Sequence, residues 1–187
     1  MQNALQHGDL MDIPARKTVY RGSVFSIEEW RLKDTGTRFA RMVSSDGVAI
    51  LPVFEDGSML LERQYRHTLD RYIYEIPAGR IDKGEAPRHA ARRELSEETG
   101  YVAGKLSFMF RFYEAPGSIT QTLHVYLAER LSEGETSFDK DEEISVLRIS
   151  SAKAMQMIRS NRIMDGKTIC GVLFWNSYLR KPHGRKL

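Results

Sequence analysis

The stretch from Gly79 to Tyr101, GRIDKGEAPRHAARRELSEETGY, constrains this chain more than any other part of its sequence. Its second half is predicted to be a helix that begins near Pro87 and ends at Gly100, and that packs on a sheet through Ala90, Ala91, Leu95 and Thr99. Positions three and four apart share one face of a helix, so Glu94, Glu97 and Glu98 are predicted to project together. Their mutual repulsion is unfavourable unless a cation neutralises it, and a divalent cation that prefers oxygen ligands, such as Mg²⁺, would do so. The alternative is a solvated acidic face paired with nearby arginines.

The spacing within this stretch is more specific than the carboxylates alone. A glycine is followed after five residues by a glutamate, and after seven more by Arg-Glu-Leu, one further residue, Glu-Glu, one further residue, a glycine and an apolar residue. These fixed positions are Gly79, Glu85, Arg93, Glu94, Leu95, Glu97, Glu98, Gly100 and Tyr101. Because so many positions rarely coincide by chance, the sequence resembles the Nudix hydrolases.

That resemblance implies hydrolysis of a diphosphate linked to another moiety, with a bound divalent metal. Mg²⁺ is the expected ion and Mn²⁺ the alternative. The residues that it implies as metal ligands are Glu94, Glu97, Glu98 and, through its backbone carbonyl, Ala78.

Further roles also follow from the resemblance. Arg93 lies four residues before Glu97 and is expected to hold a glutamate in one orientation, which makes it part of the catalytic group with Glu97. Glu85 is expected to orient the loop or the outer shell of the metal. Gly79 and Gly100 support this arrangement at the two ends of the motif.

The general base is predicted in a later acidic loop, DKDEE, just before a strand that starts at Ile144. Glu142 holds the place that corresponds to the base of the ADP-ribose branch of the family. Asp141 and Glu143 are close rivals, and a simple solvated turn is the alternative to any catalytic role.

Several short features resemble the ADP-ribose pyrophosphatases within the family. Pro116 follows Gly100 by sixteen residues, and YEIPAGRID, RQYR and IRSNRIMDGKTI also look like that branch. Because these signals agree, we expect Pro116 and Gly117 to contact the substrate, although an ordinary turn between strands is the better explanation of these two residues taken alone. Arg66 is the predicted phosphate contact, since a guanidinium matches two phosphate oxygens at once.

The expected reaction is the conversion of ADP-ribose and water to AMP and ribose 5-phosphate. The alternative within the same class is hydrolysis of GDP-mannose or another nucleoside diphosphate sugar. A non-catalytic Nudix-like nucleotide sensor is the alternative from another class, and the intact motif argues against it.

Strands interleaved with a few helices indicate a layered arrangement of the two. The resemblance implies the Nudix fold, an α+β fold (α/β/α sandwich) with a mixed central sheet between helices. A small N-terminal antiparallel sheet is predicted in residues 1–45, and the Nudix domain in residues 46–187. We expect the runs VAILPVF and SMLLERQYR to form a hairpin through the turn at Glu55-Asp56-Gly57. The small sheet buries little by itself, so it must pack on the remaining domain or on another subunit. ADP-ribose-type Nudix enzymes place an N-terminal sheet at a dimer interface, so the resemblance implies that this sheet forms the interface of a homodimer.

Composition narrows the remaining function classes. A net charge of +3 is too small to indicate nucleic-acid binding, which needs a dense basic stripe. No run of 18 apolar residues indicates a membrane span, and the first residues lack the pattern of a secretory signal. The single Cys170 lies among apolar residues and is expected to be buried. A cytoplasmic location is the simplest expectation.

Overall fold

The computed structural model describes residues 14–134 and 144–179, and these residues divide into two compact units. The described part of the smaller unit comprises residues 14–44 and 115–121. The described part of the larger unit comprises residues 45–114, 122–134 and 144–179. Two separate segments of the chain therefore contribute to the smaller unit, and the second is the connection at 115–121.

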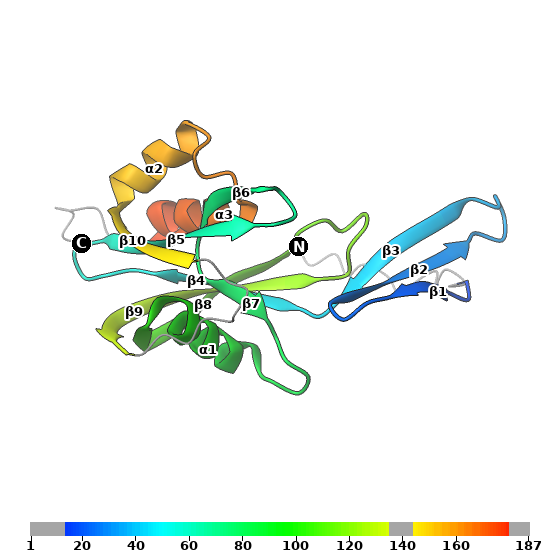
Figure 1. The fold of residues 1–187 in the computed structure, drawn as a ribbon, viewed down its shortest axis with the longest axis horizontal. Helices are drawn as coiled ribbons and strands as arrows, with labels where there is room; N and C mark the ends of the chain where they lie inside the picture. Colours follow the sequence, from blue (N-terminus) through cyan, green and yellow to red (C-terminus); the bar gives the residue numbers. More distant parts are fainter. Residues whose placement is uncertain (1–13, 135–143, 180–187) are drawn as a thin grey trace, which may run out of the picture. The chain divides into compact units, whose positions relative to one another are not determined.

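The smaller unit is a three-stranded antiparallel sheet in the order β1-β2-β3 (Figure 1). Its strands are β1 (Lys17–Arg21), β2 (Phe25–Arg31) and β3 (Arg38–Ser44). The connection at 115–121 is tied to β3 by backbone hydrogen bonds from Met42 to Ser118 at 2.8 Å and from Thr120 to Met42 at 3.0 Å. The predicted N-terminal antiparallel sheet is thus present, and its assignment as a separate functional region stays a prediction.

The larger unit contains two sheets. The first has the order β7-β4-β9-β8, with β4 and β9 parallel and the other pairs antiparallel. Its strands are β4 (Gly47–Pro52), β7 (Ala78–Arg80), β8 (Tyr101–Tyr113) and β9 (Thr122–Glu133). The second has the order β10-β5-β6 and is antiparallel, with β5 (Ser58–Arg66), β6 (Arg71–Glu75) and β10 (Ile144–Ser150).

The predicted hairpin of VAILPVF and SMLLERQYR is wrong beyond its turn. The turn itself forms, with Phe54 N–H donating to Ser58 O at 2.8 Å and one isolated bridge between Val53 and Met59. Beyond that bridge, β4 pairs with β7 and β9, whereas β5 pairs with β6 and β10. The two runs separate because each is apolar enough to be central in a different sheet.

Helices cover both faces of β4, as the alternation of its side chains requires. The helices are α1 (Pro87–Thr99), α2 (Ser151–Arg159) and α3 (Gly166–Phe174), which continues as a π-helical turn, η1 (Trp175–Leu179). Val48 and Ile50 join a buried cluster with residues of α1. Ala49 and Leu51 join another cluster with residues of α2 and α3. Figure 1 shows α1 on one side of the mixed sheet and α3 on the other, which confirms the predicted α/β/α sandwich.

Cys170 is exposed, so the expectation that it is buried is wrong. The face of α3 that packs against the sheet carries Lys167, Thr168, Gly171 and Val172 instead. The apolar letters around Cys170 belong to both faces of the helix, and the register of α3 places its thiol outward. No helix formed by residues 14–134 and 144–179 is long and apolar enough to cross a membrane.

Candidate active site

Helix α1 carries most of the predicted site, and its sequence explains its limits. Pro87 stands at the first helical position, where its missing N–H costs nothing. Gly100 ends the helix in the left-handed region with a φ of 72°, and its N–H donates to Ser96 O at 2.9 Å. The buried stripe of Ala90, Ala91 and Leu95 packs the helix on the sheet. The predicted start, stop and apolar face are all confirmed.

The acidic residues of α1 do not all point toward solvent, as one solvated face would require. Glu98 is 4% exposed, and its Oε2 accepts a hydrogen bond from the Ala78 N–H of β7 at 2.9 Å. The Glu94 side chain is 12% exposed and that of Glu97 is 39% exposed. Solvent exposure of these carboxylates therefore increases from Glu98 through Glu94 to Glu97, and Glu98 points toward β7.

Gly79 lets β7 approach this helix. A Cβ added at Gly79 would lie 2.0 Å from Cδ and Oε1 of Glu94, far inside a normal contact. Only a residue without a side chain leaves the Glu94 carboxylate in this place. The first glycine of the motif is thus a requirement of close packing between strand and helix.

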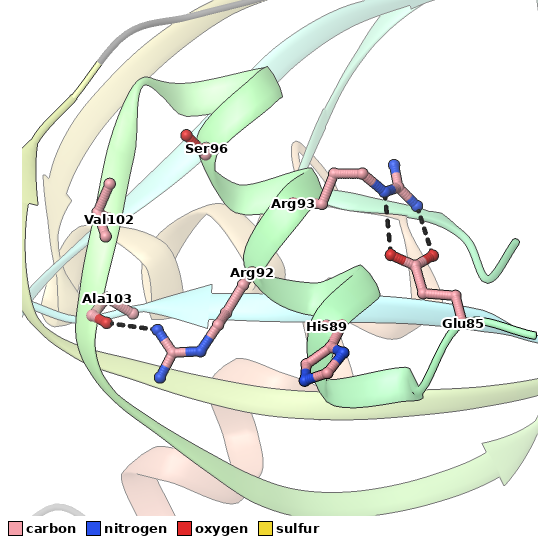
Figure 2. Close-up of a pocket in the computed structure, with 7 residues that line it drawn as sticks. All are labelled: Glu85, His89, Arg92, Arg93, Ser96, Val102 and Ala103. Carbon is pink, nitrogen blue, oxygen red and sulfur yellow. Dashed lines mark hydrogen bonds and ion pairs between the residues drawn. The ribbon is translucent and has the colours of Figure 1, made fainter.

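Arg93 connects the carboxylates that precede and follow it. It grips Glu85 with two hydrogen bonds, from Nε to Oε1 at 3.2 Å and from Nη2 to Oε2 at 3.0 Å (Figure 2). Its Nη1 donates to Glu94 Oε1 at 2.8 Å and to Glu97 Oε2 at 3.0 Å. Hydrogen bonding to Glu85 and the charges of its neighbours raise the pKa of Arg93 above its ordinary value. One guanidinium thus orients three carboxylates.

Glu85 is held as the loop residue that the sequence predicts. Hydrogen bonding to Arg93 lowers the pKa of Glu85, and a hydrogen bond from Asp82 N–H at 3.1 Å acts in the same direction. The loop before α1 is fixed to the helix by this pair, and the orienting role of Glu85 stays a prediction.

The residue types in this region, taken apart from their arrangement, fit a divalent cation. Glu94 and Glu98 supply carboxylate oxygens, the ligands that Mg²⁺ prefers, next to a strand without a Cβ at Gly79. Across residues 14–134 and 144–179, no group of three or more His, Cys, Asp or Glu side chains is close enough to hold a metal ion. Arg93 instead bridges Glu94 and Glu97. The ligand set of Ala78, Glu94, Glu97 and Glu98 stays a prediction.

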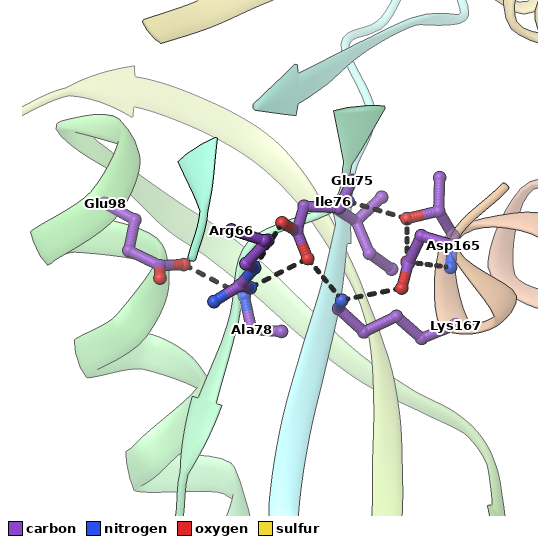
Figure 3. A network of polar contacts seen from close by, with 8 residues as sticks. Arg66, Glu75, Ile76, Ala78, Glu98, Asp165 and Lys167 are labelled. Carbon is purple, nitrogen blue, oxygen red and sulfur yellow. Dashed lines mark hydrogen bonds and ion pairs between the residues drawn. The ribbon is translucent and has the colours of Figure 1, made fainter. Parts of the chain in front are cut away.

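Arg66 is paired with Glu75, a partner that the sequence did not predict. Its Nε and Nη2 donate to the two carboxylate oxygens of Glu75, both at 2.8 Å. Glu75 also accepts from Lys167 Nζ at 2.6 Å, and Lys167 Nζ donates to Asp165 at 3.0 Å (Figure 3). The opposite charges of Arg66 and Glu75 could have suggested their pairing, because the two residues lie on successive strands. No signal in the sequence relates Lys167 of α3 to them. The phosphate contact of Arg66 stays a prediction.

The structure does not test the remaining predicted site residues. Pro116 and Gly117 belong to the smaller unit. Glu142 and its rivals Asp141 and Glu143 lie outside the described residues. Their roles stay predictions.

A pocket of about 480 Å³ lies between α1 and β8, as Figure 2 shows. It is lined by Glu85, His89, Arg92, Arg93, Ser96, Val102 and Ala103. Arg92 closes part of it by donating from Nη1 to Ala103 O at 2.9 Å. Neither Glu94 nor Glu98 lines this pocket, so it is separate from the predicted metal ligands.

Comparison with known proteins places this geometry in a family. An ADP-ribose pyrophosphatase of Bacillus subtilis (strain 168) is 36% identical over 165 residues, which cover 86% of this chain and 89% of the relative. A GDP-mannose pyrophosphatase of Salmonella paratyphi B is 37% identical over 135 residues, 67% of this chain and 68% of the relative.

A crystal structure described as an ADP compounds hydrolase matches the fold with a TM-score of 0.75 at 24% identity. The match covers 92% of this chain and 97% of that one. Residues 44–167 match the NUDIX domain, the segment that contains β7, α1 and the network around Arg93. The chain belongs to the Nudix family.

Proposed function

We propose that this Nudix pyrophosphohydrolase converts ADP-ribose and water to AMP and ribose 5-phosphate. The observation that carries the proposal is the 36% identity to an ADP-ribose pyrophosphatase over 86% of this chain. The intact network of Arg93 with Glu85, Glu94 and Glu97 supports catalysis rather than passive binding. Nudix hydrolases use a divalent metal, and we propose Mg²⁺, with Mn²⁺ as the alternative.

In this proposal, Glu94 and Glu98 hold the metal together with the carbonyl of Ala78, and Glu97 completes the set. When bound, the cation neutralises the diphosphate and activates water. Arg93 keeps the Glu94 and Glu97 carboxylates oriented, and Arg66 contacts a phosphate oxygen. Pro116 and Gly117 contact the substrate.

Glu142 is the proposed general base. It takes a proton from the attacking water, whose oxygen forms a new bond to phosphorus while the bridging phosphorus-oxygen bond breaks. Glu142→Gln is expected to lower kcat by a factor of about 10² or more, with little change in metal affinity, because a neutral amide cannot accept that proton. Steady-state kinetics and calorimetric Mg²⁺ titration measure the two effects.

Glu98→Gln is the comparison variant, and it should weaken metal binding as well as kcat. If activity falls in Glu98→Gln and not in Glu142→Gln, the assignment of Glu142 is wrong. Asp141→Asn and Glu143→Gln then identify which rival carries the base.

The second candidate function is hydrolysis of GDP-mannose, which the 37% identity to a GDP-mannose pyrophosphatase favours. A panel of ADP-ribose, GDP-mannose, ADP-glucose, diadenosine polyphosphates and FAD, each with and without Mg²⁺, distinguishes the candidates. ADP-ribose is expected to give the highest kcat/KM. A higher kcat/KM for GDP-mannose would replace ADP-ribose as the proposed substrate. The absence of product from every compound would favour a nucleotide sensor.

We also propose a cytoplasmic location, because the single cysteine cannot form an internal disulfide.

A further inference from the structure

A string of alternating charges runs from α3 to β5 within the larger unit (Figure 3). Asp165 accepts from Lys167 Nζ at 3.0 Å, and the same Nζ donates to Glu75 Oε2 at 2.6 Å. Glu75 then accepts from Arg66 Nε and Nη2 at 2.8 Å each. Two negative and two positive groups are thus joined through direct hydrogen bonds.

Arg66 is the most exposed member of this string, and the side chain of Asp165 at its other end is 15% exposed. The side chain of Glu75 is 1% exposed and that of Lys167 is 10% exposed, whereas that of Arg66 is 36% exposed. A buried ammonium and a buried carboxylate are costly without partners, so each holds the other in place. Only the guanidinium at the end of the string reaches solvent to a substantial degree.

The buried end is anchored from two directions. Asp165 caps α3, and its Oδ2 accepts from Thr168 N–H at 2.9 Å. Thr168 Oγ1 accepts from Ile76 N–H at 2.8 Å, directly beside Glu75 in the chain. Helix α3 is therefore locked to the end of β6, and Lys167 cannot shift without disturbing that junction.

The open end lies within the electrostatic reach of Glu98, one of the predicted metal ligands. Burial lowers the pKa of Arg66, but hydrogen bonding to Glu75 and the charges of Glu75, Glu98 and Asp165 raise it above its ordinary value overall. Glu75 occupies Nε and Nη2, and no hydrogen bond from Nη1 to another residue is found within 14–134 and 144–179. Arg66 therefore presents one edge of its guanidinium beyond the carboxylate that holds it.

We propose that Lys167 is a positioning residue for recognition of the substrate diphosphate: fixed by Asp165, it holds Glu75, and Glu75 aims the guanidinium of Arg66. The proposal rests on the function proposed above, in which Arg66 contacts a phosphate. The charge of Lys167 also matters, because the four groups sum to zero with it and to a net negative charge without it. A net negative string would repel a diphosphate.

The test measures ADP binding with Mg²⁺ by calorimetry, and KM and kcat for ADP-ribose, below the lowest Tm among the variants. Lys167→Met removes the charge, and Lys167→Arg restores it. Val172→Ala is the matched control, since Val172 is a fully buried apolar residue of the same helix and has no part in the string. The Lys167→Met change is also made in an Arg66→Lys background.

Lys167→Met is expected to raise the Kd for ADP and the KM for ADP-ribose about 10-fold or more, because a partner of a buried charge is lost. Lys167→Arg should recover part of this loss, and Val172→Ala should lower Tm with Kd within about twofold of the wild type. In the Arg66→Lys background, Lys167→Met should change Kd by less than about twofold, since residues that act through one another are not additive. If Lys167→Met does not fold, Asp165→Asn should raise Kd in the same direction while retaining a cap on α3.

An unchanged Kd in a folded Lys167→Met, or an equal loss in both backgrounds, would overturn the positioning role. A wild-type protein that does not bind ADP would also overturn it. Wild-type protein that binds ADP with these dependences but does not hydrolyse ADP-ribose would instead overturn the proposed substrate and leave the role of Lys167 standing.

Discussion

Gly79 shows how one residue connects the motif to the fold. Its place at the start of the motif is explained by the space that the Glu94 carboxylate occupies, where a Cβ would lie 2.0 Å from Cδ. The neighbouring residue, Ala78, donates its N–H to Glu98. Two successive residues of β7 thus define where two carboxylates of α1 lie, one by the absence of a side chain and one by a hydrogen bond.

Gly79→Ala is expected to lower activity at limiting Mg²⁺ by about 10- to 100-fold, because displaced metal-site partners typically cost that much in affinity or activity. The protein should still fold, since the clash is with the movable end of a side chain. Activity as a function of Mg²⁺ concentration and the Tm by calorimetry measure both effects.

Gly166→Ala is the control, because a Cβ at Gly166 meets nothing within 4 Å. Equal Mg²⁺ dependence in the two variants would show that the Glu94 position is not set by Gly79.

At the scale of elements, the turn after β4 is bonded to a strand of the second sheet. Asp56 Oδ1 accepts from Ser58 N–H at 2.9 Å and from Ser58 Oγ at 2.6 Å. Its Oδ2 accepts from Arg148 Nη2 of β10 at 2.8 Å, and Arg148 lies over the ring of Phe54, 3.8 Å from its centroid. The turn is therefore bonded to β10, which helps β5 leave β4 and enter the second sheet.

The pKa of Asp56 is lowered, first by the hydrogen bond from the Ser58 hydroxyl and also by Arg148. A lowered pKa in the folded state stabilises the protein above the unfolded value of 3.8, and this contribution disappears as pH falls through the folded value. Asp56→Asn should therefore reduce the free energy of unfolding at pH 7, and its difference from the wild type should shrink below about pH 4.

Urea denaturation between pH 2 and pH 7 measures this difference. Glu55→Gln removes the same charge from the same turn and is the control. A difference between Asp56→Asn and the wild type that is independent of pH would rule out the carboxylate as its cause.

At the scale of the whole molecule, the small sheet of β1, β2 and β3 has apolar side chains that are open to solvent. Several of its apolar side chains are between 43% and 52% exposed: Val19, Tyr20, Val24 and Phe39. A three-stranded sheet with this much open apolar surface has little core of its own. A second copy of the chain is the partner that the sequence predicts.

We therefore expect a particle of about twice 21.5 kDa in solution at micromolar concentration. Static light scattering measures the mass. Tyr20→Asp with Phe39→Asp should shift it toward the monomer, whereas Phe108→Asp, which changes an equally exposed aromatic residue of β8 in the larger unit, should not. A monomeric mass for the wild type would contradict the predicted interface.

The sequence predicted those features that depend on local spacing. Pro87 and Gly100 mark the ends of α1, and the contact of Arg93 with Glu97 follows from four residues of separation on a helix. Short runs of alternating apolar and polar residues likewise predicted the antiparallel sheet of the smaller unit. Such features need only neighbours in the chain, so a pattern is enough to find them.

Features that depend on distant partners were decided only by tertiary structure. The spacing of Glu98 in the sequence predicts a place on an acidic helix face. In the structure its carboxylate is buried and accepts a hydrogen bond from the N–H of Ala78 in β7, twenty residues earlier in the chain. Glu75 and Lys167 are 92 residues apart, and no local pattern relates them. The sequence by itself determined the chemical family of the protein, since the motif is local. The tertiary structure decided which charged side chains are paired near this motif. A buried charge is costly without an opposite charge, and the fold can supply that partner from any part of the sequence.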